Sequence, residues 1–129
     1  FGYPVGQVPQ MDAFSFESDE ALRKIAVKAC KDVNPDIEVY EGRIASGDQF
    51  VADQAVKDRI VKDFGAYAVE MEGASIAHTA YLNHIPFLVV RAISDKADGS
   101  AEMDYPTFEA MAAEHSVKMT LRILKDIQD

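Results

Sequence analysis

The sequence has little of several features that particular protein classes need. It contains one cysteine, Cys30, so it cannot form an internal disulfide, which suits a reducing cytoplasm. No apolar run approaches the ~18–20 residues that a membrane-spanning helix needs, and no signal-peptide pattern is present. We therefore expect a cytoplasmic protein. The first residue is Phe1 rather than Met, so a cleaved or partial chain is expected as well.

Basic residues are also scarce. The 129 residues include 13 Lys and Arg against 22 Asp and Glu, a formal net charge of −9 at pH 7. This charge repels phosphate backbones and anionic lipids, so it excludes nucleic-acid and membrane-surface roles. His78, His84 and His115 lack the spacing of metal ligands, and there is no Gly-x-Gly-x-x-Gly or Walker motif. We expect no metal and no cofactor.

The patterns that are present alternate between helical and strand-like segments. Residues 1–16 are rich in Gly and Pro and predict an extended arm. Helices are predicted over 18–34 with Ser18 as N-cap, over 53–65 between Asp53 and Gly65, over 73–83, and from Pro106 onward. Strands are predicted over 37–45, 67–71 and 86–93, the last being an apolar run typical of a strand covered on both faces.

This alternation predicts an α/β fold, with three α/β/α layers around a twisted, mostly parallel or mixed sheet. The last helix is expected to carry one largely apolar face. Its residues are Val117, Thr120, Leu121 and Leu124.

Polar residues follow each of the three predicted strands. Ligands of open α/β sheets bind beyond the carboxyl ends of the strands, which the topology brings to one edge. We therefore expect a binding site where three clusters meet, residues 46–50, 70–72 and 91–95.

Asp95 is the candidate for proton transfer. A carboxyl that is partly desolvated at the end of a buried strand holds its proton more readily and can act as a general acid. Ser94 beside it could support the transferred proton. An Asp after a strand is also a common turn residue, so capping a turn is the alternative.

Glu70 and Glu72 stand two residues apart, so in an extended strand both point to one face. Ionised carboxylates accept hydrogen bonds and suit the vicinal hydroxyls of a ribose, and Arg91 could hold one of them bidentately. A structural Arg–Glu pair in the sheet is the alternative. Phe50 and Met71 suit the face of a flat heterocycle, although both also suit a plain core.

Three stretches together resemble the 5′-methylthioadenosine/S-adenosylhomocysteine nucleosidases, which belong to the nucleoside phosphorylase family. They are GRIASGDQF at 42–50, VEMEGA at 69–74 and RAISDKAD at 91–98. The Glu-Met-Glu element is shared across the wider family, whereas its combination with the third stretch is more specific to the nucleosidases. The resemblance covers essentially the whole chain. It implies hydrolysis of the N-glycosidic bond to give adenine and a thioribose.

The resemblance also implies a role for individual residues. Asp95 would be the general acid that protonates adenine N7, supported by Ser94, so that adenine leaves as a neutral base while the ribose gains oxocarbenium character. The implied substrate-binding residues are Phe50 and Val51 at the adenine, Met71 and Glu72 at the ribose, Arg91 near Glu72 and the attacking water, Tyr105 over the alkylthio group, and Val69 and Glu70 beside them.

The same resemblance implies a homodimer. Phe1, Tyr3 and Pro9 would belong to an arm that closes the neighbouring subunit's pocket. In the family, this stretch is roughly the second half of one longer domain, whose first half supplies the glutamate that activates water. We therefore expect residues 1–129 to be the C-terminal part of one nucleosidase-type domain, with little hydrolysis on their own. The alternatives are a purine nucleoside phosphorylase, a non-catalytic nucleoside-binding fragment, or a purely structural partner of the missing half.

Overall fold

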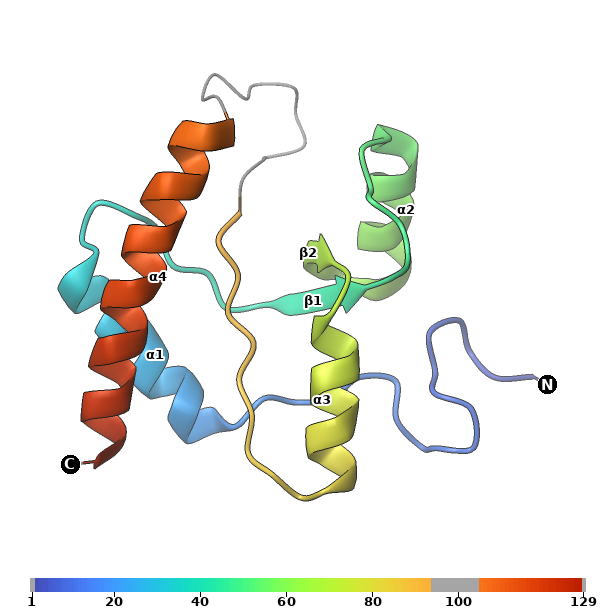
Figure 1. The fold of residues 1–129 in the computed structure, drawn as a ribbon. Helices are drawn as coiled ribbons and strands as arrows, with labels where there is room; N and C mark the ends of the chain where they lie inside the picture. The colour runs from blue at the N-terminus through green and yellow to red at the C-terminus, as the bar shows by residue number, and fades with distance from the viewer. Residues whose placement is uncertain (1, 94–104, 129) are drawn as a thin grey trace. The chain divides into compact units, whose positions relative to one another are not determined.

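The computed structural model describes residues 2–93 and 105–128 of the chain (Figure 1). Two compact units divide them. The first unit comprises residues 2–18 and 42–89, and the second comprises 19–41, 90–93 and 105–128. The elements are α1 (Glu20–Val33), β1 (Arg43–Ser46), α2 (Gln54–Phe64), β2 (Ala66–Glu70), α3 (Gly73–Leu82) and α4 (Tyr105–Gln128). The predicted α/β class with parallel strands is confirmed.

The first unit is a β-α-β arrangement followed by a helix. β1 and β2 pair in parallel, and α2 supplies the crossover that parallel strands require. α2 packs against β2 and α3 packs against β1. The ends of α2 are as predicted. The Asp53 carboxylate accepts a hydrogen bond from the Val56 N–H at 3.0 Å, and Gly65 ends the helix with a φ of 62°.

The second unit pairs α1 with α4, which lie side by side (Figure 1). Ala26 and Ala29 of α1 are buried, as is Met119 of α4. Asn34 ends α1, and its Nδ2 donates to the His115 carbonyl of α4 at 3.0 Å. Small side chains on α1 let the helices approach closely, and the Asn34 hydrogen bond fixes their register.

Two helices begin at residues other than those predicted. The N-cap of α1 is Asp19 rather than Ser18, because the Asp19 carboxylate accepts the Leu22 N–H at 2.8 Å. α4 begins at Tyr105, one residue before Pro106. In the described part of the chain, no helix has the length and apolar character that a membrane crossing requires.

The predicted apolar face of α4 is not the face that packs against α1. The four residues of that face are all exposed, namely Val117, Thr120, Leu121 and Leu124. The buried side chain is Met119, at 8 % exposure, because α1 packs against a neighbouring face of the helix.

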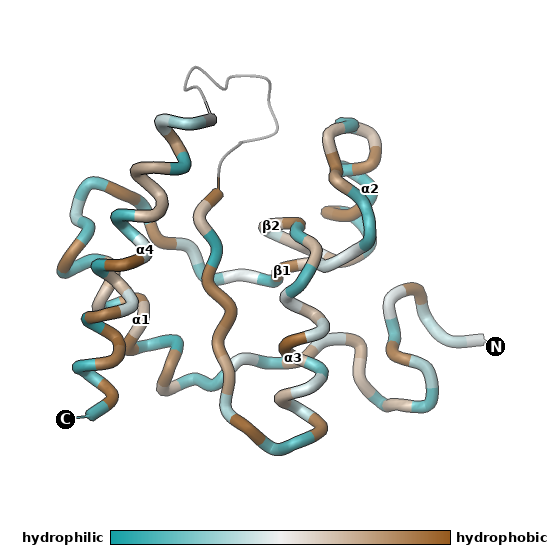
Figure 2. The backbone as a smooth tube through the Cα atoms, viewed as in Figure 1, coloured by the Kyte–Doolittle hydropathy of each residue, from teal (hydrophilic) through white to brown (hydrophobic). Residues whose placement is uncertain are grey.

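Two of the three predicted strands are present, with shifted bounds. The strand expected over 37–45 is confined to Arg43–Ser46, and that expected over 67–71 lies one residue earlier. Residues 86–93 are not a strand, although most of them are apolar (Figure 2). A strand needs a neighbour to complete its hydrogen-bond ladder, and in the described residues the sheet contains only β1 and β2.

Candidate functional site

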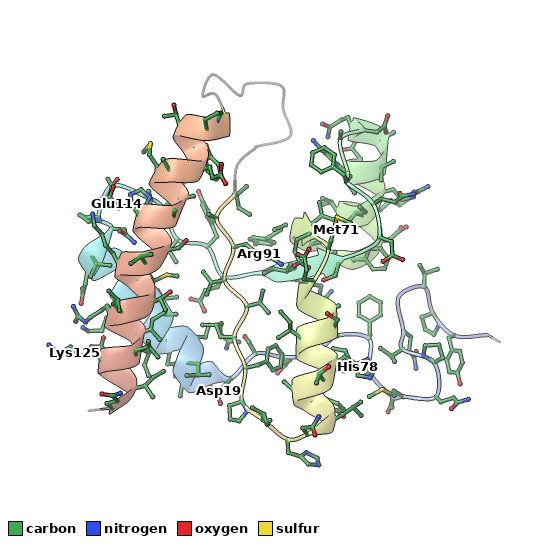
Figure 3. All side chains as sticks on the ribbon, in the orientation of Figure 1. Asp19, Met71, His78, Arg91, Glu114 and Lys125 are labelled. Carbon is green, nitrogen blue, oxygen red and sulfur yellow. The ribbon has the colours of Figure 1, made fainter. Side chains whose placement is uncertain are left out.

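The carboxyl ends of β1 and β2 lie together in the first unit. Ser46 is opposite Glu70 in the parallel register, and the Gly47 N–H donates to the Glu70 carbonyl at 3.1 Å. The loop after β1 and the Met71–Glu72 turn therefore leave the sheet at the same edge, and Met71 can be followed between β2 and the start of α3 (Figure 3). Two of the three predicted polar clusters, 46–50 and 70–72, meet as expected.

The Glu70 carboxylate organises this edge. Its Oε2 accepts the Gly73 N–H at 2.7 Å and the Glu72 N–H at 3.1 Å. Its Oε1 accepts the Ser46 hydroxyl, and Ser46 Oγ in turn accepts the Ala74 N–H at 2.7 Å. The Ser46–Glu70 pair thus satisfies the N–H groups at the start of α3, where negative charge is favoured by the helix dipole.

Gly73 allows the carboxylate to approach the helix this closely. A methyl group at position 73 would lie 3.0 Å from Glu70 Oε1. Glu72 is the N-cap residue by position, with φ −127° and ψ −27°, but its side chain makes no cap hydrogen bond. Glu70 therefore caps α3 from outside the helix. The contact between Ser46 and Glu70 was not predicted from the sequence, in which Ser46-Gly47 at the end of a strand is the only indication of it.

The other predicted substrate-binding residues of the first unit lie on β2 and on the loops that leave this edge. Phe50 is 89 % exposed in the loop after β1, and Val51 is half-buried. Val69 and Met71 are both exposed at the end of β2. The exposed Phe50 ring offers a flat apolar face on the loop that leaves the sheet at the same edge as Glu70 and Glu72.

The arm that precedes α1 has no helix or strand over residues 2–16, as predicted. Phe14 packs on α2, where its ring centroid lies 6.2 Å from that of Phe64. The Arg43 guanidinium lies 5.3 Å from the centroid of the Phe14 ring. Tyr3 accepts the Gln10 N–H through its hydroxyl at 3.2 Å, and Pro9 is exposed.

The third predicted cluster, residues 91–95, belongs to the second unit and lies only in part within the described residues. Arg91 is exposed and belongs to the second unit. Ser94, Asp95 and Phe1 lie outside the described residues, as does the side chain of Tyr105. Their roles stay predictions.

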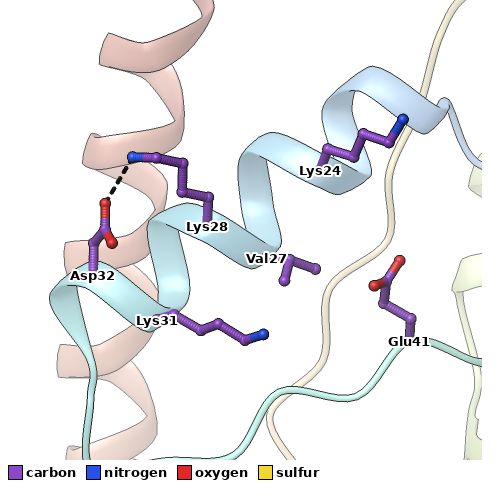
Figure 4. A pocket seen from close by; sticks show the side chains of 6 residues that line it. All are labelled: Lys24, Val27, Lys28, Lys31, Asp32 and Glu41. Atoms are coloured by element: carbon purple, nitrogen blue, oxygen red, sulfur yellow. Dashed lines mark hydrogen bonds and ion pairs between the residues drawn. The ribbon is translucent and has the colours of Figure 1, made fainter.

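A cavity of about 330 Å³ lies on α1 in the second unit (Figure 4). Lys28 Nζ donates to Asp32 Oδ2 there at 2.9 Å, which is the main reason that the pKa of Asp32 is below its usual value. The cavity is lined by Lys24, Val27, Lys28, Lys31, Asp32 and Glu41, none of which was predicted as a site residue. Within the described ranges, no three His, Cys, Asp or Glu residues gather as a metal site.

Comparison with known proteins identifies the family of the chain. The family model described as Phosphorylase superfamily matches residues 1–125. The chain belongs to the phosphorylase superfamily. The 5′-methylthioadenosine/S-adenosylhomocysteine nucleosidase of Treponema pallidum is 37 % identical over 147 residues, covering 97 % of this chain and 55 % of its own length.

Two further members of the superfamily are similar to this chain. The aminodeoxyfutalosine nucleosidase of Campylobacter jejuni is 38 % identical, covering 98 % of this chain and 54 % of its own. The solved 5′-methylthioadenosine/S-adenosylhomocysteine nucleosidase of Neisseria meningitidis, in complex with methylthio-immucillin-A, has a TM-score of 0.82 at 40 % identity. The match covers 97 % of this chain and 54 % of that one. The chain spans about half the length of the relatives it matches.

Proposed function

We propose that this chain carries the adenine- and ribose-binding half of a nucleosidase that hydrolyses the N-glycosidic bond of 5′-methylthioadenosine and S-adenosylhomocysteine. One observation supports this proposal most directly. The loop of Phe50 and the Met71–Glu72 turn leave the sheet at the same edge, where the hydrogen bonds of Glu70 hold them. The names of the relatives in Treponema pallidum and Neisseria meningitidis support the substrate class.

In this proposal each residue acts on one part of the nucleoside. Phe50 stacks on adenine and the Val51 backbone contacts its edge, while Met71 packs on the ribose. Glu72 accepts hydrogen bonds from the ribose hydroxyls, as an ionised carboxylate does. Asp95, supported by Ser94, donates a proton to adenine N7. Protonation removes negative charge from the leaving base, so the bond to the ribose breaks more easily.

The remainder of the enzyme is also proposed. Because the relatives are about twice as long, a polypeptide equivalent to their unmatched half would supply the glutamate that activates water. Residues 1–129 would then form the C-terminal part of one domain. Phe1, Tyr3 and Pro9 would close the pocket of the second subunit in a cytoplasmic homodimer, and Tyr105 and Arg91 would complete the 5′ and water sides of the site.

A second candidate substrate is aminodeoxyfutalosine. The Campylobacter jejuni relative that carries this name is 38 % identical and matches nearly the whole chain.

The experiment is an adenine-release assay with and without phosphate. The proteins are residues 1–129 alone and residues 1–129 preceded by the N-terminal half of the Neisseria meningitidis nucleosidase. The chimaera is expected to release adenine from 5′-methylthioadenosine without phosphate, and the chain alone to release little. Release that requires phosphate would identify a phosphorylase instead. Repeating the assay with aminodeoxyfutalosine shows which of the two substrates is cleaved faster.

A further inference from the structure

We propose that the Ser46–Glu70 pair is a positioning device that sets the spacing between the adenine-binding loop and the ribose-binding turn. In this role Glu70 acts through the backbone of Glu72 rather than on the ribose itself. The inference rests on the proposed function, because it assigns the two sides of the edge to the base and the sugar.

Glu70 holds the turn that follows β2. Its carboxylate accepts the N–H groups of Glu72 at 3.1 Å and Gly73 at 2.7 Å. Through Ser46 Oγ, which accepts the Ala74 N–H at 2.7 Å, the same pair reaches a third consecutive backbone donor. Hydrogen bonds to a charged acceptor are stronger than those between neutral groups, so the backbone of Glu72 is fixed relative to β1.

Glu70 also holds the loop that follows β1. The Gly47 N–H donates to the Glu70 carbonyl at 3.1 Å, and the Ser46 hydroxyl donates to the Glu70 carboxylate. One residue thereby contacts both strand ends, through its main chain on one side and its side chain on the other. The Phe50 loop and the Glu72 turn cannot move apart without breaking these bonds.

The consequence is specific to ligands that span both sides. Adenine alone contacts the loop after β1 and, in the proposed function, Asp95, but not the Glu72 turn, so a small displacement of that turn leaves its affinity unchanged. An adenine nucleoside contacts both sides. When the pair is loosened, nucleoside binding must also order the Glu72 turn, and this entropic cost lowers the affinity. The pair should therefore affect nucleoside affinity and spare adenine affinity.

The experiment is calorimetric titration of residues 1–129 with 5′-methylthioadenosine and, separately, with adenine. Ser46→Ala and Glu70→Gln remove parts of the pair, and Ser46→Thr restores the hydroxyl on a residue suited to a strand. The matched controls are Thr79→Ala, which removes a hydroxyl from α3 away from its first turn, and Glu114→Gln, which neutralises an exposed carboxylate on α4.

We expect Ser46→Ala and Glu70→Gln to weaken 5′-methylthioadenosine binding about tenfold, the loss of one charge-assisted hydrogen bond. Adenine binding should stay within about twofold, and Ser46→Thr and both controls should match the wild type. Equal losses for adenine and the nucleoside would reduce the pair to a structural role and overturn the inference, as would no loss for either. A wild-type chain that binds neither ligand would overturn the proposed function as well.

Amide hydrogen exchange gives a second measurement that does not depend on affinity. The N–H groups of Gly73 and Ala74 are expected to exchange faster in Ser46→Ala, while those in the middle of α2 keep the wild-type rate. Unchanged exchange at both residues would show that Ser46 does not hold the turn.

Discussion

Gly73 shows at the scale of one residue how closely this edge is packed. A side chain at position 73 would meet the Glu70 carboxylate, whereas one at Gly47 would meet nothing within 4 Å. We expect Gly73→Ala to lower the free energy of unfolding by about 1–3 kcal/mol, the usual cost of overpacking. Urea unfolding measures this, with Gly47→Ala as the control. Equal stability of the two variants would contradict the packing around Glu70.

Asp95 provides the prediction that concerns the chemical step. In the chimaera described above, Asp95→Asn removes the proposed proton donor but keeps the shape and hydrogen bonding of the side chain. We expect adenine release to fall ~10²–10⁴-fold, the usual contribution of one acid–base group, with nucleoside binding partly retained. An unchanged rate of adenine release would remove Asp95 from the mechanism.

The pairing of α1 with α4 can be tested at the scale of the element. Met119 is buried on α4, whereas Met111 on the same helix is 42 % exposed. Truncating a buried methionine leaves a cavity, so we expect Met119→Ala to cost about 2–5 kcal/mol and Met111→Ala less than 1 kcal/mol. Chemical denaturation monitored by circular dichroism compares them. A larger loss of stability for Met111→Ala would contradict the packing of the Met119 face of α4 against α1.

Asp32 links the same helices and makes their stability depend on pH. Its pKa is lowered chiefly by the hydrogen bond from Lys28, and Arg122 of α4 also binds it at 2.9 Å. Because the unfolded chain binds this proton more readily, the contribution of Asp32 is present at neutral pH and is lost progressively as pH falls below about 5 and through the lowered pKa of the folded state.

We expect Asp32→Asn to melt at a lower temperature than the wild type at pH 7, and the gap to shrink at pH 3. Thermal melts at the two pH values measure it. Asp63→Asn, which makes the same charge change at an exposed position of α2, is the control. A gap that is constant with pH would contradict the role of the ionised Asp32.

The elements also show what local sequence can predict. The ends of α2 follow from Asp53 and Gly65, whose effects depend only on neighbouring backbone groups. The strand prediction over 86–93 was wrong, because a strand depends on a hydrogen-bonded neighbour that local sequence does not reveal. The predicted meeting of 46–50 with 70–72 was right, since parallel strands share an edge. The contact of Ser46 with Glu70 was missed because it depends on the strand register.

The molecule as a whole exposes an unusual amount of large apolar surface. Phe50, Ile76 and Leu121 are each more than half exposed. Such surface in the described residues is typical of regions that another polypeptide or a ligand covers. This agrees with a chain that spans about half the length of its relatives. The net charge of −9 repels nucleic acids but is compatible with an uncharged nucleoside.

The most direct test of the central claim is a calorimetric titration of residues 1–129 with methylthio-immucillin-A, the ligand of the Neisseria meningitidis relative. The account predicts one binding site per chain whose affinity falls in Glu72→Gln, while Glu20→Gln, an exposed carboxylate on α1, behaves as the wild type. A flat trace for the wild type, or equal affinity in Glu72→Gln, would contradict it.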